Sequence, residues 1–151
     1  MEGDRRLEYP PLTEEHAESR QRLQALVDRL TDEQLTQPLG DGWTAAALLA
    51  HIAFWERAAV LVYRQQQLGT AAYPILDEDV TNNALLPEWL ALPPRVAVQL
   101  ALDAVAAVDR IVDERGDEVI SPHEDEDQFV GMARAGHRIY HIREIERAFP
   151  H

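Results

Sequence analysis

Two histidines near the end of the chain have a spacing that suits metal binding. His137 and His141 stand four residues apart in the stretch 133–149, which has the pattern of a helix. An α-helix turns by about 100° per residue, so the two imidazoles lie on one face, a single turn apart. Glu144 falls on the same side of this helix. The pair therefore raises the question of which third group it faces.

A third histidine lies on the apolar face of another predicted helix. His51 occupies the middle of an apolar stripe at helical spacing, which consists of Leu48, His51, Phe54, Trp55, Ala58 and Val62. A single histidine there would ordinarily be a hydrogen-bonded core residue, and this alternative stays open. Three inward-facing histidines would need three sets of buried partners, which one metal ion satisfies together. We therefore predict that His51, His137 and His141 bind one metal ion.

The donor set restricts the kind of metal site. Three neutral nitrogens with an open fourth position are typical of catalytic zinc centres, although Zn, Ni, Cu and Fe all accept such ligands. The residue after His137 is Arg138, not the glutamate of a zinc protease, and no Glu-x-x-His pair indicates a di-iron site. The absence of cysteine excludes disulfides, thiolate zinc sites and a cysteine nucleophile.

The carboxylates near these histidines have several possible roles. Glu144, one turn beyond His141, could orient a ligand imidazole, move protons as a catalytic residue or be an ordinary boundary charge. Asp77 and Asp79 are further candidates for proton transfer. Tyr140, Phe54 and Trp55 are candidates for a pocket wall or for core packing.

Four amphipathic helices would position these groups. The apolar periodicity predicts helices at about 14–30, from the N-cap Thr44 to about 68, from Pro93 and Pro94 to about 116, and at about 127–148. Between the second and third, the prolines of 70–94 indicate a long connection with one short helix near 80–86. We therefore expect one all-α domain over 1–151, a four-helix bundle with a long connection between helices 2 and 3.

Charge and hydropathy narrow the class of partner. The net charge of -13 argues against binding to nucleic acid or to an anionic membrane surface. Neither a signal peptide nor a membrane span is apparent, which favours the cytoplasm. We expect His16, His123 and His151 to be solvated. We expect Arg134 and Arg138 to lie on a solvated face of the last helix, with a dimer seam as the alternative.

Two motifs together resemble the DinB/YfiT-like superfamily. The stretch WTAAALLAHIAFWE, residues 43–56, is similar to that family's pattern of a tryptophan and a capping Ser or Thr before a helix whose His precedes an aromatic and an acid. The stretch GHRIYHIREI, residues 136–145, is similar to the His-x-x-x-His signature of its last helix. The order and lengths of the predicted helices also fit.

The resemblance implies a fold, a metal and a range of activities. Relatives hold a divalent metal, often nickel or zinc, through one His of the second helix and two of the fourth, which correspond to His51, His137 and His141. Relatives are often dimers, so a homodimer is expected. Some use a low-molecular-weight thiol as transferases or isomerases, others are hydrolases, and many have no known activity.

Three kinds of function remain open from the sequence. The first is a metal-dependent enzyme, either a thiol-dependent transferase or a hydrolase, that acts on a small electrophilic molecule. Any thiol would then come from a cosubstrate, because the chain has no cysteine. The second is a metal-binding or ligand-binding bundle without catalysis. The third is a protein whose histidines are hydrogen-bonded in the core and which acts only by association.

Overall fold

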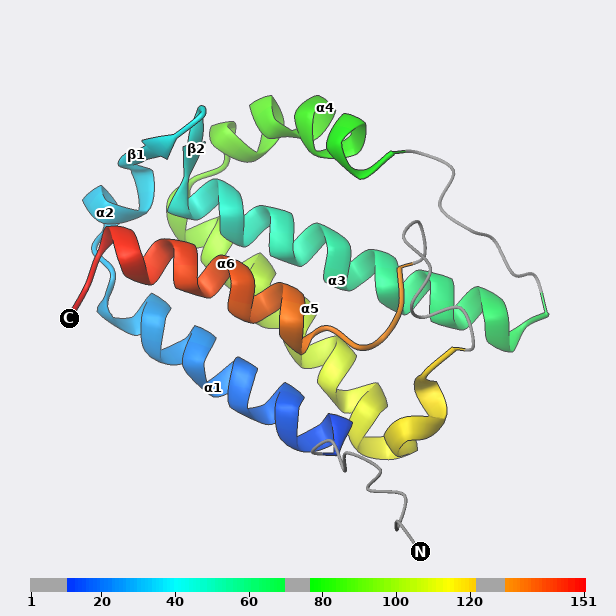
Figure 1. Cartoon of the computed structure of the whole chain (residues 1–151). Helices are drawn as coiled ribbons and strands as arrows, with labels where there is room; N and C mark the ends of the chain where they lie inside the picture. The colour runs from blue at the N-terminus through cyan, green and yellow to red at the C-terminus, as the bar shows by residue number, and fades with distance from the viewer. Residues whose placement is uncertain (1–10, 70–76, 122–129) are drawn as a thin grey trace, which may run out of the picture.

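The chain folds as an assembly of helices with one small hairpin. A computed structural model describes residues 11–69, 77–121 and 130–151 (Figure 1). The elements in these ranges are α1 (Leu12–Arg29), α2 (Asp32–Thr36), β1 (Pro38–Gly40), β2 (Trp43–Thr44), α3 (Ala45–Gln67), α4 (Glu78–Ala91), α5 (Pro94–Arg115), the 3-10 helix η1 (Gly116–Val119) and α6 (Ala135–Ala148). The prediction of an all-α fold is confirmed, with six α-helices in the described ranges where four long helices and one short helix were expected.

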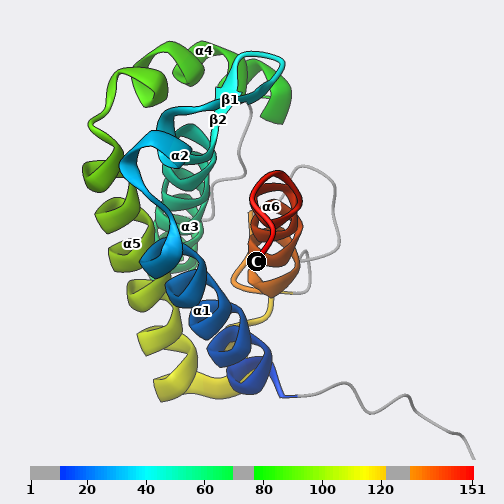
Figure 2. The ribbon, with the colours of Figure 1, turned by 90° about the vertical axis from the view of Figure 1, so that its left-hand side faces the viewer.

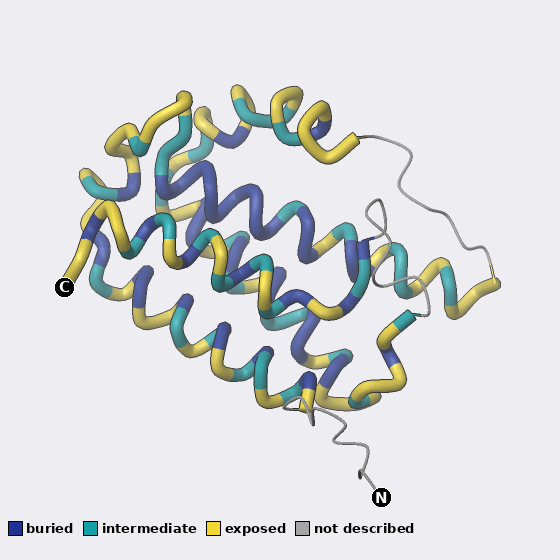
Figure 3. The backbone as a smooth tube through the Cα atoms, in the orientation of Figure 1, coloured by how far each residue is buried: buried dark blue, intermediate teal, exposed yellow. Residues whose placement is uncertain are grey.

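The long helices pack against one another around a shared core. α3 packs along α5, α1 contacts α5 and α6, and α6 returns to contact α3 (Figures 1 and 2). The N-terminal part of α3 is buried almost throughout, as Figure 3 shows. Small residues make this close packing feasible, because Ala97, Ala101 and the alanines of α3 let the helix backbones approach. α3 is thus the central element of the fold.

A hairpin and a helix cap determine where α3 begins. β1 and β2 pair antiparallel, and the turn between them places Asp41 at φ 53° and Gly42 at φ 82°. Thr44 follows as the N-cap, and its hydroxyl accepts a hydrogen bond from the Ala47 amide at 3.1 Å. The predicted cap at Thr44 is confirmed. The hairpin turn consequently lies beside the first turns of α3.

The helix between α3 and α5 is twice as long as the one predicted near 80–86. Residues 70–76 lie outside the described ranges, and α4 begins at Glu78. Asp77 caps it by accepting a hydrogen bond from the Val80 amide. Pro87 lies inside α4, although we expected proline to limit the helix; the buried Trp89 beyond it packs into the core and stabilises the last turn.

The last helix begins later than the sequence suggested. We predicted a start near Asp127, which lies outside the described ranges, whereas α6 begins at Ala135 and the described residues before it are not helical. Val130 and Met132 are buried against α3 and α5 in this non-helical segment. The helix therefore starts where a non-helical segment with buried apolar side chains ends.

One helix is apolar enough to raise the question of a membrane. We expected no such segment, but α3 has the length and the mean hydropathy of a membrane span. Of its most apolar stretch, 72% is buried inside the fold, as is typical of a core helix. Its hydropathy is thus accounted for by contacts with the other helices.

The predicted solvated face of the last helix is wrong for two arginines. Arg138 is 0% exposed and Arg134 is 9% exposed. Arg138 forms ion pairs with Glu56 of α3 and with Asp109 of α5, the second at 2.8 Å. Arg134 lies 3.3 Å from the other oxygen of Glu56. Because buried carboxylates need such partners, the two arginines face inward.

The same network includes a histidine that we expected in solvent. His16 is 1% exposed; its Nδ1 lies 3.1 Å from Asp109, and its Nε2 accepts a hydrogen bond from the Arg134 amide at 3.0 Å. The prediction that His16 is solvated is therefore wrong. His151 is exposed as predicted, and His123 lies outside the described ranges.

Removing the central arginine should destabilise the protein strongly. Arg138→Ala leaves Glu56 and Asp109 buried with fewer cationic partners, so we expect a loss of about 3–5 kcal/mol in the free energy of unfolding. The exposed Arg143 of the same helix provides the control, and Arg143→Ala should change the free energy of unfolding by less than about 0.5 kcal/mol. Urea denaturation of the two variants measures both values. Equal, small losses would contradict the inward role of Arg138.

Candidate metal centre

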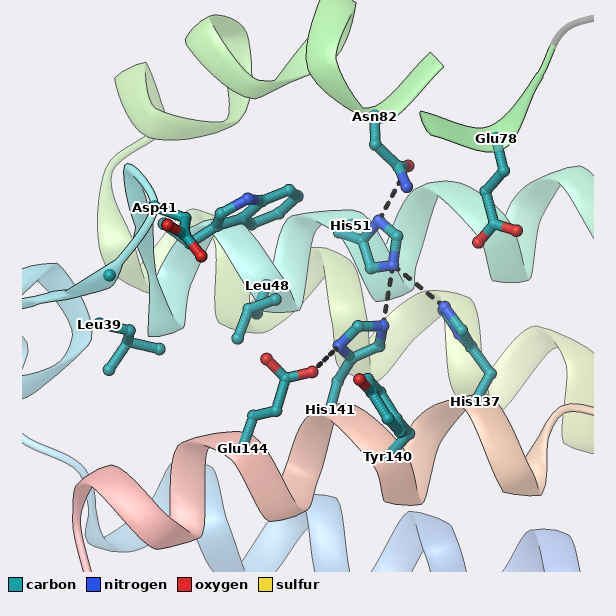
Figure 4. A pocket seen from close by; sticks show the side chains of 12 residues that line it. Leu39, Asp41, Leu48, His51, Glu78, Asn82, His137, Tyr140, His141 and Glu144 are labelled. Carbon is teal, nitrogen blue, oxygen red and sulfur yellow. Dashed lines mark hydrogen bonds and ion pairs between the residues drawn. The ribbon is translucent and has the colours of Figure 1, made fainter. Parts of the chain in front are cut away.

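Three imidazoles from two helices converge at one point. His51 lies in the middle of α3 and is 2% exposed, whereas His137 and His141 lie on successive turns of α6 (Figure 4). The Nε2 atom of His51 is 3.0 Å from Nε2 of His137 and 3.0 Å from Nε2 of His141. Metal–nitrogen bonds of about 2.0–2.1 Å place ligand nitrogens roughly 3 Å apart. The three predicted ligands thus meet in an arrangement that could hold one metal ion.

The outer nitrogen of His51 faces an amide that the sequence did not single out. Asn82 of α4 places its Oδ1 at 3.1 Å from Nδ1 of His51. Asn82 falls within the short helix predicted near 80–86, but periodicity alone does not show which side of an isolated, weakly amphipathic helix faces the core. The contact adds a third helix to the two that carry the imidazoles.

The outer nitrogen of His141 faces a carboxylate. Oε1 of Glu144 lies 2.9 Å from Nδ1 of His141. An ionised carboxylate only accepts hydrogen bonds, so His141 donates from Nδ1 and leaves Nε2 without a proton. Of the readings open for Glu144, the geometry favours a residue that orients this imidazole.

The outer nitrogen of His137 has a different partner. Nη2 of Arg134 lies 3.0 Å from Nδ1 of His137. A guanidinium only donates, so Nδ1 accepts and the proton of the neutral ring lies on Nε2, at the centre of the three rings. His137 is consequently less well prepared to bind a metal than His141. Its proton must first leave Nε2, and moving it to Nδ1 would break the hydrogen bond from Arg134.

Burial keeps the three rings neutral. The pKa of His51 is lowered from 6.5 to about 3, mainly by burial and in smaller part by the neighbouring His141. Burial also lowers the pKa of His137, with a contribution from the Arg134 guanidinium. The pKa of His141 is lowered by burial, although Glu144 opposes the shift. Neutral imidazoles are the form in which histidine binds metals.

The imidazoles lie at the wall of a cavity of about 480 Å³. It is lined by Leu39, Gly40, Asp41, Trp43, Leu48, His51, Glu78, Asn82, His137, Tyr140, His141 and Glu144 (Figure 4). The hairpin, α3, α4 and α6 all contribute to this wall. A cavity of this size suits a small molecule.

The proposed pocket residues divide into two groups. Tyr140, a candidate for the pocket wall from the sequence, lines the cavity, and Glu144, which was not predicted there, lines it as well. Phe54 and Trp55 pack against each other with ring centroids 5.1 Å apart, and neither is among the residues that line the cavity. Asp77 caps α4, and of the three consecutive acidic residues 77–79, Glu78 is the one that lines the cavity. Sequence spacing could not distinguish these three neighbours, because the start of α4 was not known.

Fold and site together define a class of protein, a helical fold in which three histidines are positioned to hold a metal ion beside a small cavity. The sequence model of the DinB superfamily matches residues 15–145, a range that contains His51, His137, His141 and Glu144. The chain therefore belongs to the DinB superfamily, and the resemblance seen in the two motifs is confirmed. No protein of curated function and no solved structure matches the chain significantly.

The lowered pKa values predict a pH dependence of the metal-free protein. Because the folded pKa of His51 is about 3 and the unfolded value is 6.5, the unfolded chain binds protons first as the pH falls below 6.5. His51 therefore contributes stability that is fully present above pH 6.5 and falls on the order of 1 kcal/mol per pH unit below it, down to about pH 3.

Urea denaturation between pH 7 and pH 4, after chelation and desalting, measures the slope of the free energy of unfolding against pH. His51→Gln should reduce the slope, because it removes one buried, neutral imidazole. His151→Gln alters an exposed histidine and should leave the slope unchanged. Parallel slopes for the native protein and His51→Gln would show that His51 does not contribute in this way.

Proposed function

We propose that this protein is a metal-dependent enzyme that binds one divalent ion through His51, His137 and His141. The observation that carries the proposal is the pair of Nε2 atoms of His51 and His141, 3.0 Å apart. Glu144 makes His141 a donor at Nδ1, and Asn82 can do the same for His51, so two nitrogen lone pairs face each other. With both protons on Nδ1, a cation between the two Nε2 atoms removes this repulsion.

Zinc or nickel is the metal we propose, in keeping with three neutral nitrogen donors and with the superfamily. When bound, such an ion lowers the pKa of a coordinated water or thiol, which prepares either for attack on an electrophile. The residues of the chain then hold the ligand set, and Glu144 fixes the His141 ring. No cysteine is present, so a reacting thiol would be a low-molecular-weight cosubstrate.

We propose two reaction types for the cavity, thiol-dependent transfer and hydrolysis, each on a small electrophilic molecule. Glu144 lines the cavity while it hydrogen-bonds His141, so it is also our candidate for the carboxylate that takes up a proton. Product formation with thiols and simple electrophiles, and with esters or epoxides alone, tests the two types. Loss of the rate in Glu144→Gln, with metal still bound, would support proton transfer.

A non-catalytic metal-binding protein is the alternative. It is favoured by the way the centre joins α3, α4 and α6, since a metal there would stabilise contacts among three helices. The wider picture that we propose is a four-helix bundle built from α1, α3, α5 and α6, homodimeric and cytoplasmic, without nucleic-acid or membrane partners. Absence of turnover in a stably metal-loaded protein would favour the alternative.

Metal binding itself should be stoichiometric and should depend on the histidines. Titration of chelated protein with Zn²⁺ or Ni²⁺ should show one ion per chain, and an excess near 100 times the Kd should raise the melting temperature on the order of 5–10 °C. His51→Ala should abolish both effects, whereas His151→Ala should retain them. Binding that survives in His51→Ala would contradict the site.

The arginine beside His137 should oppose metal binding. Arg134→Met removes the donor that keeps the His137 proton on Nε2, and it removes a positive charge near the ion, so we expect an affinity about tenfold higher. Calorimetric titration with Zn²⁺ measures the change. Arg143→Met on the exposed side of α6 is the control. A weaker affinity in Arg134→Met, with the fold intact by circular dichroism, would refute this role.

A further inference from the structure

One amide oxygen lies between two side chains of α3. Oδ1 of Asn82 is 2.8 Å from Nε1 of Trp55 and 3.1 Å from Nδ1 of His51. His51 and Trp55 are four residues apart, so both rings leave α3 on the same side. Trp55 is 7% exposed and His51 is 2% exposed. The half-buried amide of α4 is therefore held in place by two groups of the neighbouring helix.

The tryptophan decides which way the amide points. An indole N–H can only donate, so the atom that it meets must be the amide oxygen and not the amide nitrogen. The same oxygen then faces Nδ1 of His51, which must donate in turn. The single proton of the neutral ring is thereby fixed on Nδ1, and Nε2 presents its lone pair to His137 and His141.

The opposite orientation of the amide would have the opposite effect. A flipped Asn82 would direct its NH₂ group at Nδ1 of His51, and this nitrogen would then accept a hydrogen bond. The proton would move to Nε2 and occupy the position of the ion. The flipped amide would also leave the Trp55 N–H facing another hydrogen-bond donor. The indole thus excludes the arrangement that is incompatible with metal binding.

We propose that Asn82, locked by Trp55, is a positioning residue that presets His51 as a metal ligand. It does not contact the ion; it acts by selecting the tautomer and the ring orientation of His51. The same contact ties α4 to the centre, although α4 supplies none of the three imidazoles. This inference rests on the proposed metal-binding function, and the measurements below separate the two.

The first test compares metal affinities. Asn82→Leu keeps the approximate size of the side chain but removes the acceptor, so we expect the Kd for Zn²⁺ to rise 10- to 100-fold. Asn82→Asp keeps an acceptor oxygen for both donors and should bind within about threefold of the native protein. Trp55→Phe removes the N–H that fixes the orientation of the amide but keeps the amide itself. Its loss of Zn²⁺ affinity should therefore be smaller than that of Asn82→Leu.

Asn83→Leu is the matched control, because it makes the same substitution at the adjacent, exposed position of α4. Its affinity should equal that of the native protein. Visible absorption of the Co²⁺-loaded proteins adds a second readout, since a displaced His51 changes the ligand field while a general loss of stability does not. Native affinity in Asn82→Leu, or an equal loss in Asn82→Asp, would overturn the proposal.

The second test needs no metal. Long-range ¹H–¹⁵N correlation spectra of the chelated protein report the tautomer of each histidine ring. We expect His51 to carry its proton on Nδ1 in the native protein and in Asn83→Leu, and to lose this preference in Asn82→Leu. A native His51 protonated on Nε2 would overturn the proposal even if metal binds. If the native protein binds no metal, the proposed function fails and the spectra still decide the role of Asn82.

Discussion

Three imidazole rings share one largely buried space, and each ring has two nitrogens that need partners. This constraint explains much of the surrounding structure. Asn82, Glu144 and Arg134 each satisfy one outer nitrogen, and they come from three different places along the chain. The inner nitrogens face one another, with two of them 3.0 Å from that of His51. A polar group that is buried without a partner costs free energy, so the outer partners are as much a part of the site as the histidines.

A second buried network holds the helix that carries two of these rings. Arg138 follows His137 directly and is 0% exposed between Glu56 of α3 and Asp109 of α5. Because its planar guanidinium engages both carboxylates, the rotation of α6 about its own axis is restricted. His137 and His141 are then presented on the side that faces His51. The ion pairs of one face of α6 thus determine the direction of the imidazoles on the neighbouring face.

The sequence was sufficient to predict the features that depend on local spacing. The apolar stripe of α3 placed His51 inside, the four-residue interval joined His137 to His141, and Thr44 marked the start of α3, as the structure confirms. Features that depend on partners distant in the chain were not predictable. Arg138 resembles a solvated residue of an amphipathic helix until Glu56 and Asp109, 82 and 29 residues away, are placed beside it. Asn82 was missed for the same reason, since nothing near it in the chain indicates His51 or Trp55.

The late start of α6 joins these two networks. The backbone N–H of Arg134 donates to Nε2 of His16, so His16 must carry its own proton on Nδ1, from which it donates to Asp109. Asp109 in turn accepts from Arg138, and Arg134 reaches both Glu56 and His137. Hydrogen bonds and ion pairs therefore run without interruption from α1 through the core to the imidazole centre. A shift of α1 or α5 would change the position of Arg134. This would in turn change its contact with His137, the one histidine whose proton lies between the three rings. Under the proposed function, the affinity for a metal would therefore depend on packing far from the cavity, and His137 is the histidine through which that dependence would act.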